Sequence, residues 1–158
     1  WEEEARKAEA HGVRTVALRI GVVLGDGGGA LEQMVPAFRS FVGGPVGSGR
    51  QWMPWVHHAD VVGLLLRAVD DTRCAGPVNV VAPGIVRNSE FSASIGRALH
   101  RPSWMPVPAF ALRVLFGDAA DVILTGQHVL PKRALELGYV FRFPTLDAAM
   151  QDAVKGSD

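Results

Sequence analysis

Residues 13–20 constrain the fold of this chain more than any other stretch. They read VRTVALRI, a run rich in apolar and β-branched residues that is bounded by Gly12 and Gly21. Such a run is typical of a strand buried in a parallel sheet. Parallel strands need long crossover connections, which are usually helical. The segments around this strand are therefore expected to include helices.

The flanking segments alternate between helical and strand patterns. Apolar residues dominate 61–69, so that helix is expected to be buried on more than one side. The order β-α-β-α predicts an α/β fold with helices on the faces of a parallel sheet. The expected helices cover residues 1–10, 30–41, 61–69 and 88–100, and a second short strand is expected over 77–82.

Two polar residues at helix starts are assigned structural roles. Asp60 lies in the first turn of the helix over 61–69, where a carboxylate complements the helix dipole, and this role is preferred to catalysis. Asn88 is expected to be the N-cap of the next helix, with Glu90 in its first turn. Neither residue is therefore a candidate for chemistry.

Beyond Arg101 prolines interrupt the chain and the helical patterns become short. We divide the chain into an α/β part over 1–100 and a small, mostly helical lobe over 101–158. Tyr139 is the one tyrosine, and core packing is its expected role. Helices are expected over 109–116, 118–125, 131–137 and 146–154, with an edge strand over 139–143.

Composition excludes several classes of function. The 16 basic and 16 acidic residues balance, so neither a nucleic-acid patch nor a polybasic membrane surface is expected. No apolar run reaches the ~18 residues of a membrane span, and no Cys/His spacing suits a metal. The single cysteine, Cys74, suits a reducing compartment, so a cytoplasmic protein is predicted. The start at Trp1, inside a helical pattern, is typical of a fragment of a longer protein.

The loop over residues 45–60 carries the unusual chemistry of the chain. Its sequence, PVGSGRQWMPWVHHAD, combines glycines with aromatic and hydrogen-bonding side chains. Loops placed by a rigid scaffold often carry function, although the tryptophans of this loop could equally cover the core. The candidate substrate contacts are Arg50, Gln51, Trp52, Trp55 and His57.

Three segments together resemble the C-terminal half of NAD(P)-dependent epimerase/dehydratase-like proteins, the extended or atypical short-chain dehydrogenase/reductases. They are VALRIGVVLG (16–25), GPVGSGRQWMPWVH (44–57) and QHVLPKRALELGY (127–139). The third, followed by FRFP (141–144), resembles the small C-terminal domain of unknown function of the "epimerase family protein" subfamily. The match covers essentially the whole chain. It implies the C-terminal part of a Rossmann-type parallel sheet plus a small, mostly helical, substrate-side lobe.

The resemblance also implies what lies outside the chain. The Gly-rich dinucleotide-binding half would precede it and act as its partner, and so would the tyrosine–lysine pair of such enzymes. The catalytic residues are therefore unknown. The implied cofactor is NADP, with NAD as the alternative, and the implied cofactor contacts are Arg19, Gly21 and Gly25. For Arg19 the alternative is an ion pair with an acid on a helix.

The loop departs from the pattern of sugar-nucleotide epimerases. The arginine that binds the substrate diphosphate in those proteins falls on Met53, the next acid on Pro54, and an expected asparagine on Val22. A thioether and an alkyl group replace neither a cation nor an amide. A sugar-nucleotide substrate is therefore not expected.

Two functions remain open. The first is an NADP(H)-dependent oxidoreductase or epimerase acting on an unidentified small substrate, with the isolated chain inactive. The second is a non-catalytic NADP(H)-binding sensor or scaffold. A sheet without its first strands has an exposed edge, which favours association into a homo-oligomer.

Overall fold

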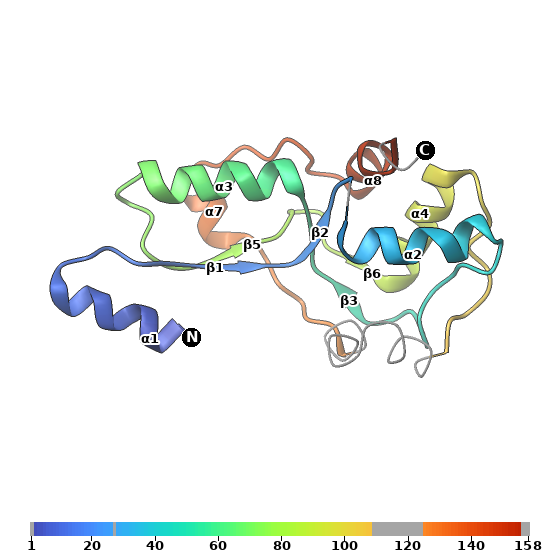
Figure 1. Cartoon of the computed structure of the whole chain (residues 1–158), viewed down its shortest axis with the longest axis horizontal. Helices are drawn as coiled ribbons and strands as arrows, with labels where there is room; N and C mark the ends of the chain where they lie inside the picture. Colours follow the sequence, from blue (N-terminus) through green and yellow to red (C-terminus); the bar gives the residue numbers. More distant parts are fainter. Residues whose placement is uncertain (1, 27, 109–124, 156–158) are drawn as a thin grey trace.

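The computed structural model of the chain describes residues 2–26, 28–108 and 125–155 (Figure 1). The fold is α/β, as predicted. In chain order the elements are α1 (Glu2–Arg6), the 3-10 helix η1 (Lys7–His11), β1 (Val16–Ile20), β2 (Val22–Leu24), α2 (Gly29–Arg39), β3 (Trp52–Met53), β4 (Trp55–His57), α3 (His58–Asp70), β5 (Gly76–Val80), β6 (Val86–Arg87), α4 (Asn88–Leu99), α7 (Lys132–Glu136) and α8 (Leu146–Lys155).

β1 and β2 form one extended stretch that changes partner at Gly21. β1 runs parallel to β5, β2 runs parallel to β4, and the short strands β3 and β6 pair antiparallel. At the change of partner the Gly21 N–H donates to the Val80 carbonyl at 3.1 Å. A Cβ on Gly21 would lie 2.7 Å from the Pro54 carbonyl oxygen. Glycine is therefore needed here because three backbone segments meet.

Helices gather at two places along these strands (Figure 1). α3 and α7 lie beside β1 and β5, where Leu64, Val56 and Val80 form a buried cluster. α2, α4 and α8 lie together near β2 and build the largest cluster, which includes Trp55, Phe91 and Met150. α8 of the predicted C-terminal lobe thus packs directly into the core of the α/β part.

The outer side of α3 differs from the prediction. We expected this helix to be buried on more than one side, but only Asp60, Leu64 and Ala68 are buried, on the side that faces the sheet. The exposed apolar side chains, at 47% to 65% exposure, are Val62, Leu65, Leu66 and Val69. No described element packs on this side, which the apolar pattern alone did not reveal.

The predicted edge strand over 139–143 does not form. The backbone N–H groups of Arg142 and Phe143 donate instead to the carboxylate of Asp60, at 2.8 and 3.0 Å. The buried carboxylate thus accepts the backbone hydrogen bonds that the carbonyl groups of a neighbouring strand would have accepted. α7 and α8 confirm the helices expected around this segment. The helix expected over 109–116 lies outside the described residues, as does all of the helix expected over 118–125 except residue 125.

The start of α4 also corrects a prediction. The N-cap is Arg87, whose backbone N–H donates to the Glu90 carboxylate at 2.9 Å. Asn88 is the first helical residue and is 1% exposed. Its side-chain oxygen accepts a hydrogen bond from the Val46 N–H at 2.7 Å. Asn88 therefore fixes the start of the 45–60 loop instead of capping its own helix.

Candidate functional site

A cavity of about 660 Å³ lies at the carboxyl ends of β1 and β5. In open α/β sheets, ligands bind in the crevice outside the carboxyl ends of the strands. Three parts of the chain meet here: the strand ends, the 45–60 loop and the start of the C-terminal segment. The lining residues are Arg19, Ile20, Gly21, Val22, Met53, Pro54, Asn79, Val81, Gln127, His128, Val129, Leu130 and Lys132.

Residues 127–130 cover this cavity and are fastened at two points. The side-chain amide of Asn79 donates to the Leu130 carbonyl at 3.1 Å. The His128 ring meets the Trp52 indole edge-on, with 4.5 Å between ring centroids. The Arg87 guanidinium lies over the Trp52 ring, with its Cζ atom 3.5 Å from the ring centroid. The cover is therefore held by β5 on one side and by the 45–60 loop on the other.

Arg19 lies in the cavity lining near the end of β1 and is exposed. Its guanidinium donates to both carboxylate oxygens of Glu2 in α1, at 2.6 and 2.7 Å. This hydrogen-bonded pair lowers the pKa of the Glu2 carboxyl and raises that of Arg19. The ion pair with a helix acid, one of the two roles considered for Arg19, is therefore present. A bidentate arginine of this kind has the geometry that also suits phosphate.

The two glycines predicted to contact the cofactor have different surroundings. Gly21 lines the cavity, where its lack of a side chain allows the Pro54 backbone to approach. Gly25 is not among the lining residues. A Cβ on Gly25 would lie 2.7 Å from Nδ1 of His58, so this glycine allows β2 to pack closely against the start of α3.

None of the five predicted substrate contacts lines the cavity. Arg50 is exposed, and its carbonyl accepts a hydrogen bond from the Arg87 side chain. The Gln51 amide donates within the loop, to the Val46 carbonyl at 3.1 Å. Trp52 is half-buried and reaches the cavity wall through His128. The loop therefore borders the cavity through neighbouring residues.

Trp55 and His57 lie in the core, each 1% exposed. The Trp55 indole N–H donates to the Gly84 carbonyl at 2.7 Å. Nδ1 of His57 accepts from the Ala59 N–H at 3.2 Å and so caps α3. Burial lowers the pKa of the His57 imidazole, and the neighbouring charge of His58 lowers it further. In this structure both side chains hold the loop from inside the core, and neither is among the residues that line the cavity.

Met53 and Pro54 are the loop residues that face the cavity, together with Val22 of β2. These are the three positions at which the sequence departs from the sugar-nucleotide pattern. The sequence analysis identified these positions as lost polar residues of the sugar-nucleotide pattern. It did not predict that they line the cavity. It also missed Asn79 and His128, whose segments are separated from the loop along the chain and carry no spacing signal of their own.

None of the helices in the described residues is both long enough and apolar enough to span a bilayer. Within residues 2–26, 28–108 and 125–155, no group of three His, Cys, Asp or Glu side chains is arranged to hold a metal ion.

Comparison with known proteins gives closely similar relatives. The chain is 48% identical over 151 residues to the chloroplastic SDR39U1 homolog of the epimerase family proteins from Arabidopsis thaliana, covering 96% of this chain and 43% of that protein. It is 45% identical over 155 residues to epimerase family protein SDR39U1 of Mus musculus, covering 98% of this chain and 53% of that protein. The chain thus spans about half the length of the curated relatives it matches.

Solved structures and a family model agree with these relatives. The fold matches the crystal structure of human epimerase family protein SDR39U1 (isoform2) with NADPH, with a TM-score of 0.84 and 42% identity, covering 90% of this chain and 49% of that one. Residues 107–153 match a domain of unknown function, DUF1731. The chain therefore matches the C-terminal part of an NAD(P)-dependent epimerase/dehydratase-like "epimerase family protein", including its small C-terminal domain of unknown function.

Proposed function

We propose that this chain supplies the nicotinamide-side and substrate-side walls of the ligand cleft in an NADP(H)-dependent oxidoreductase or epimerase that acts on a small substrate. The observation that carries the proposal is the cavity at the carboxyl ends of β1 and β5. Its position is the one at which open α/β sheets bind ligands. The similar human protein was solved with NADPH, which supports a nicotinamide cofactor here.

Arg19 is the proposed phosphate contact of the cofactor. Its guanidinium already makes a bidentate pair, with Glu2, at the rim of the cavity. A phosphate group would replace the Glu2 carboxylate by the same two-point geometry. NADP is the proposed cofactor because the similar human protein was solved with NADPH, and NAD is the alternative. Gly21 is the proposed point of close backbone approach, and Gly25 supports it through packing against His58.

The substrate is proposed to be small and not a sugar nucleotide. Val22, Met53 and Pro54 give one wall of the cavity an apolar surface without a cation for a diphosphate. His128, which packs against Trp52, forms part of the adjoining wall. Arg50 and Gln51, on the same loop, stay proposed contacts for a substrate that extends beyond the cavity.

A non-catalytic NADP(H)-binding sensor or scaffold is the second candidate. Within this chain the one tyrosine, Tyr139, does not supply a catalytic acid or base. The Tyr139 hydroxyl is bonded to Asp60 at 3.0 Å, and burial together with that carboxylate raises its pKa to about 12. Such a group is unsuited to acid–base chemistry near neutral pH. A Tyr-x-x-x-Lys pair before Trp1, and substrate-dependent oxidation of NADPH, would favour the enzyme.

The proposal is tested by NADPH titration of a protein that carries this chain behind the dinucleotide-binding half that the family resemblance implies. Arg19→Ala is expected to raise the Kd about 5- to 150-fold, the range of a charge-assisted hydrogen bond. Glu2→Gln releases the guanidinium and is expected to leave the affinity equal or higher. Arg142→Gln, which removes an exposed arginine outside the cavity, is the control. An unchanged Kd for Arg19→Ala would refute the cofactor contact.

A further inference from the structure

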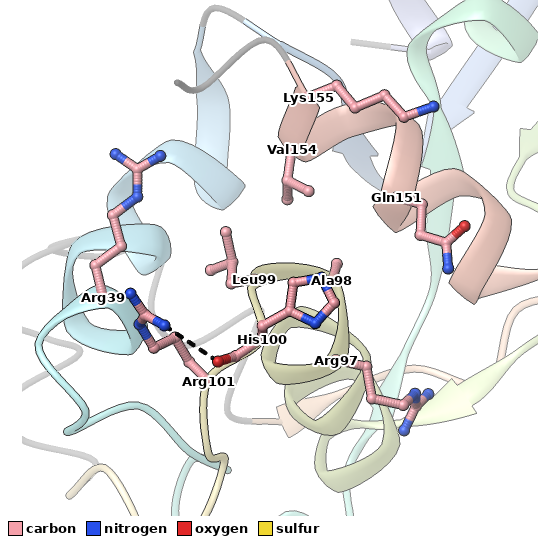
Figure 2. A pocket seen from close by; sticks show the side chains of 9 residues that line it. All are labelled: Arg39, Arg97, Ala98, Leu99, His100, Arg101, Gln151, Val154 and Lys155. Atoms are coloured by element: carbon pink, nitrogen blue, oxygen red, sulfur yellow. Dashed lines mark hydrogen bonds between the residues drawn. The ribbon is translucent and has the colours of Figure 1, made fainter.

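A second cavity, of about 850 Å³, lies where α2, α4 and α8 end (Figure 2). It shares no residue with the cleft at the strand ends. Helices α2 and α4 are in contact, as are α4 and α8, so the three ends form one wall. The lining residues are Arg39, Arg97, Ala98, Leu99, His100, Arg101, Gln151, Val154 and Lys155.

Four of the lining residues are cationic, Arg39, Arg97, Arg101 and Lys155, and none of the described residues in the lining is Asp or Glu. Arg39, Arg97 and Lys155 lie in the last turns of their helices. A helix C-terminus carries roughly half a negative charge, so three helix ends offset part of this positive charge. Arg97 is also paired with Asp147 at 2.5 Å. Arg101 lies beyond the helix end and adds a further cation to the lining.

The turn after α4 sets Arg101 at the cavity. His100 ends the helix in the left-handed conformation, with φ 53°, and the Arg101 N–H donates back to the Gly96 carbonyl at 2.8 Å. The guanidinium donates to the His100 carbonyl at 3.2 Å and lies 4.8 Å from the Phe41 ring centroid. The cation is thus positioned at the cavity by its neighbours, and a guanidinium has five N–H donors in all.

The middle of the cavity is apolar. Figure 2 shows Leu99 and Val154 facing one another across it, with Arg39, Arg97, Arg101 and Lys155 arranged around them. Ligand sites commonly combine an apolar lining with a few polar groups that fix orientation. Arginine and lysine are the side chains that bind phosphate groups in such sites.

We propose that this cavity binds a small organic phosphate, with the phosphate group at the cations and the carbon skeleton against Leu99 and Val154. Basic residues at helix ends also serve the helix dipole alone. That role requires each cation only at its own helix end. Here cations from three helices and from the turn after α4 surround one apolar cavity, and Arg101 belongs to no helix.

The test is calorimetric titration of the purified protein at low ionic strength, with inorganic phosphate and n-hexyl phosphate as probes. One site per chain is expected, and hexyl phosphate is expected to bind about tenfold more tightly because its methylene groups leave water. Arg101→Gln and Lys155→Gln together are expected to weaken binding at least about tenfold. Both side chains are exposed, so the fold is expected to persist, and Arg142→Gln is the matched control.

Each contrary result overturns the proposal. These results are the absence of saturable binding through the millimolar range, equal losses in Arg142→Gln and in the double variant, and equal affinity for the two probes. Co-sedimentation with vesicles of phosphatidylcholine and phosphatidic acid distinguishes a lipid head group from a soluble ester. Binding to those vesicles that the double variant abolishes would overturn the assignment to a soluble ligand.

Discussion

The carboxylate of Asp60 accepts a hydrogen bond from the hydroxyl of Tyr139, 79 residues further along the chain, at 3.0 Å. The same carboxylate accepts the backbone N–H groups of Arg142 and Phe143. Asp60 is fully buried. One side chain in the first turn of α3 therefore fixes the path of the chain between α7 and α8. Asp60 lies in the first turn of the helix, as expected, but its hydrogen-bond partners are in the C-terminal segment.

Asp60→Asn is expected to lower the free energy of unfolding by about 1–3 kcal/mol, the cost of a buried polar group left unsatisfied. The amide NH₂ of asparagine must replace one carboxylate oxygen and so faces either Phe143 N–H or the Arg142 and Tyr139 donors. Urea unfolding measures the change. Asp70→Asn, at the exposed end of the same helix, is expected to change stability by less than about 0.5 kcal/mol. Equal effects of the two substitutions would contradict the role of Asp60.

The hydroxyl of Tyr139 is expected to make stability fall between about pH 10 and about pH 12. Its pKa is raised from 10.0 to about 12 in the folded protein, first by burial and then by Asp60. Below pH 10 both states keep the proton. Between the two values the unfolded state loses it first, so stability declines as pH rises.

Tyr139→Phe tests this dependence, and the single tyrosine makes the tyrosinate absorbance unambiguous. The variant is expected to lose about 1 kcal/mol at neutral pH, the net value of one hydrogen bond, and to decline less steeply above pH 10. Half-ionisation of the folded wild-type protein at pH 10 would refute the raised pKa.

The imidazole of His57 is expected to reduce stability in acid. Burial lowers its pKa below the ordinary 6.5. As pH falls below 6.5, the unfolded state takes up a proton that the folded state resists, so stability falls until the folded-state pKa is passed. His57→Asn keeps a residue that caps helices well but does not titrate. Its unfolding free energy is expected to vary less between pH 7 and pH 5 than that of the wild type.

His11→Asn is the control for that slope, because His11 is exposed in η1. It is expected to reproduce the wild-type dependence on pH. If His57→Asn also reproduces it, then burial of His57 does not destabilise the protein in acid.

The positions of the main helices and of the parallel pair β1–β5 followed from local pattern, whereas the parallel pair β2–β4 lies in segments that were expected to be loops. The strand over 13–20 and the helix over 146–154 were recognised by apolar spacing and by breakers at their ends, and β1 and α8 confirm them. The edge strand over 139–143 was wrong because its backbone donors bond to Asp60, far away in sequence. Local pattern reports which residues favour a strand, but it does not report whether a partner strand is present.

The candidate site was predicted at the level of segments and less well at the level of side chains. The end of β1 and the 45–60 loop do border the cavity. Within the loop, Met53 and Pro54 face the cavity, whereas Trp55 is in the core. Alternation along so short a strand allows either face to be the inner one. Residue type alone therefore led us to predict the polar and aromatic residues of the loop as ligand contacts, and not their neighbours Met53 and Pro54.

By itself the sequence determined the α/β class, the order of elements and the family resemblance, because these depend on local propensity, apolar spacing and motifs read in order. Only the tertiary structure decided that Arg19 pairs with Glu2, that Asp60 holds Tyr139, and that residues 127–130 cover the cleft. Each of these depends on where segments distant in the chain come to lie. That placement results from the packing of the whole core.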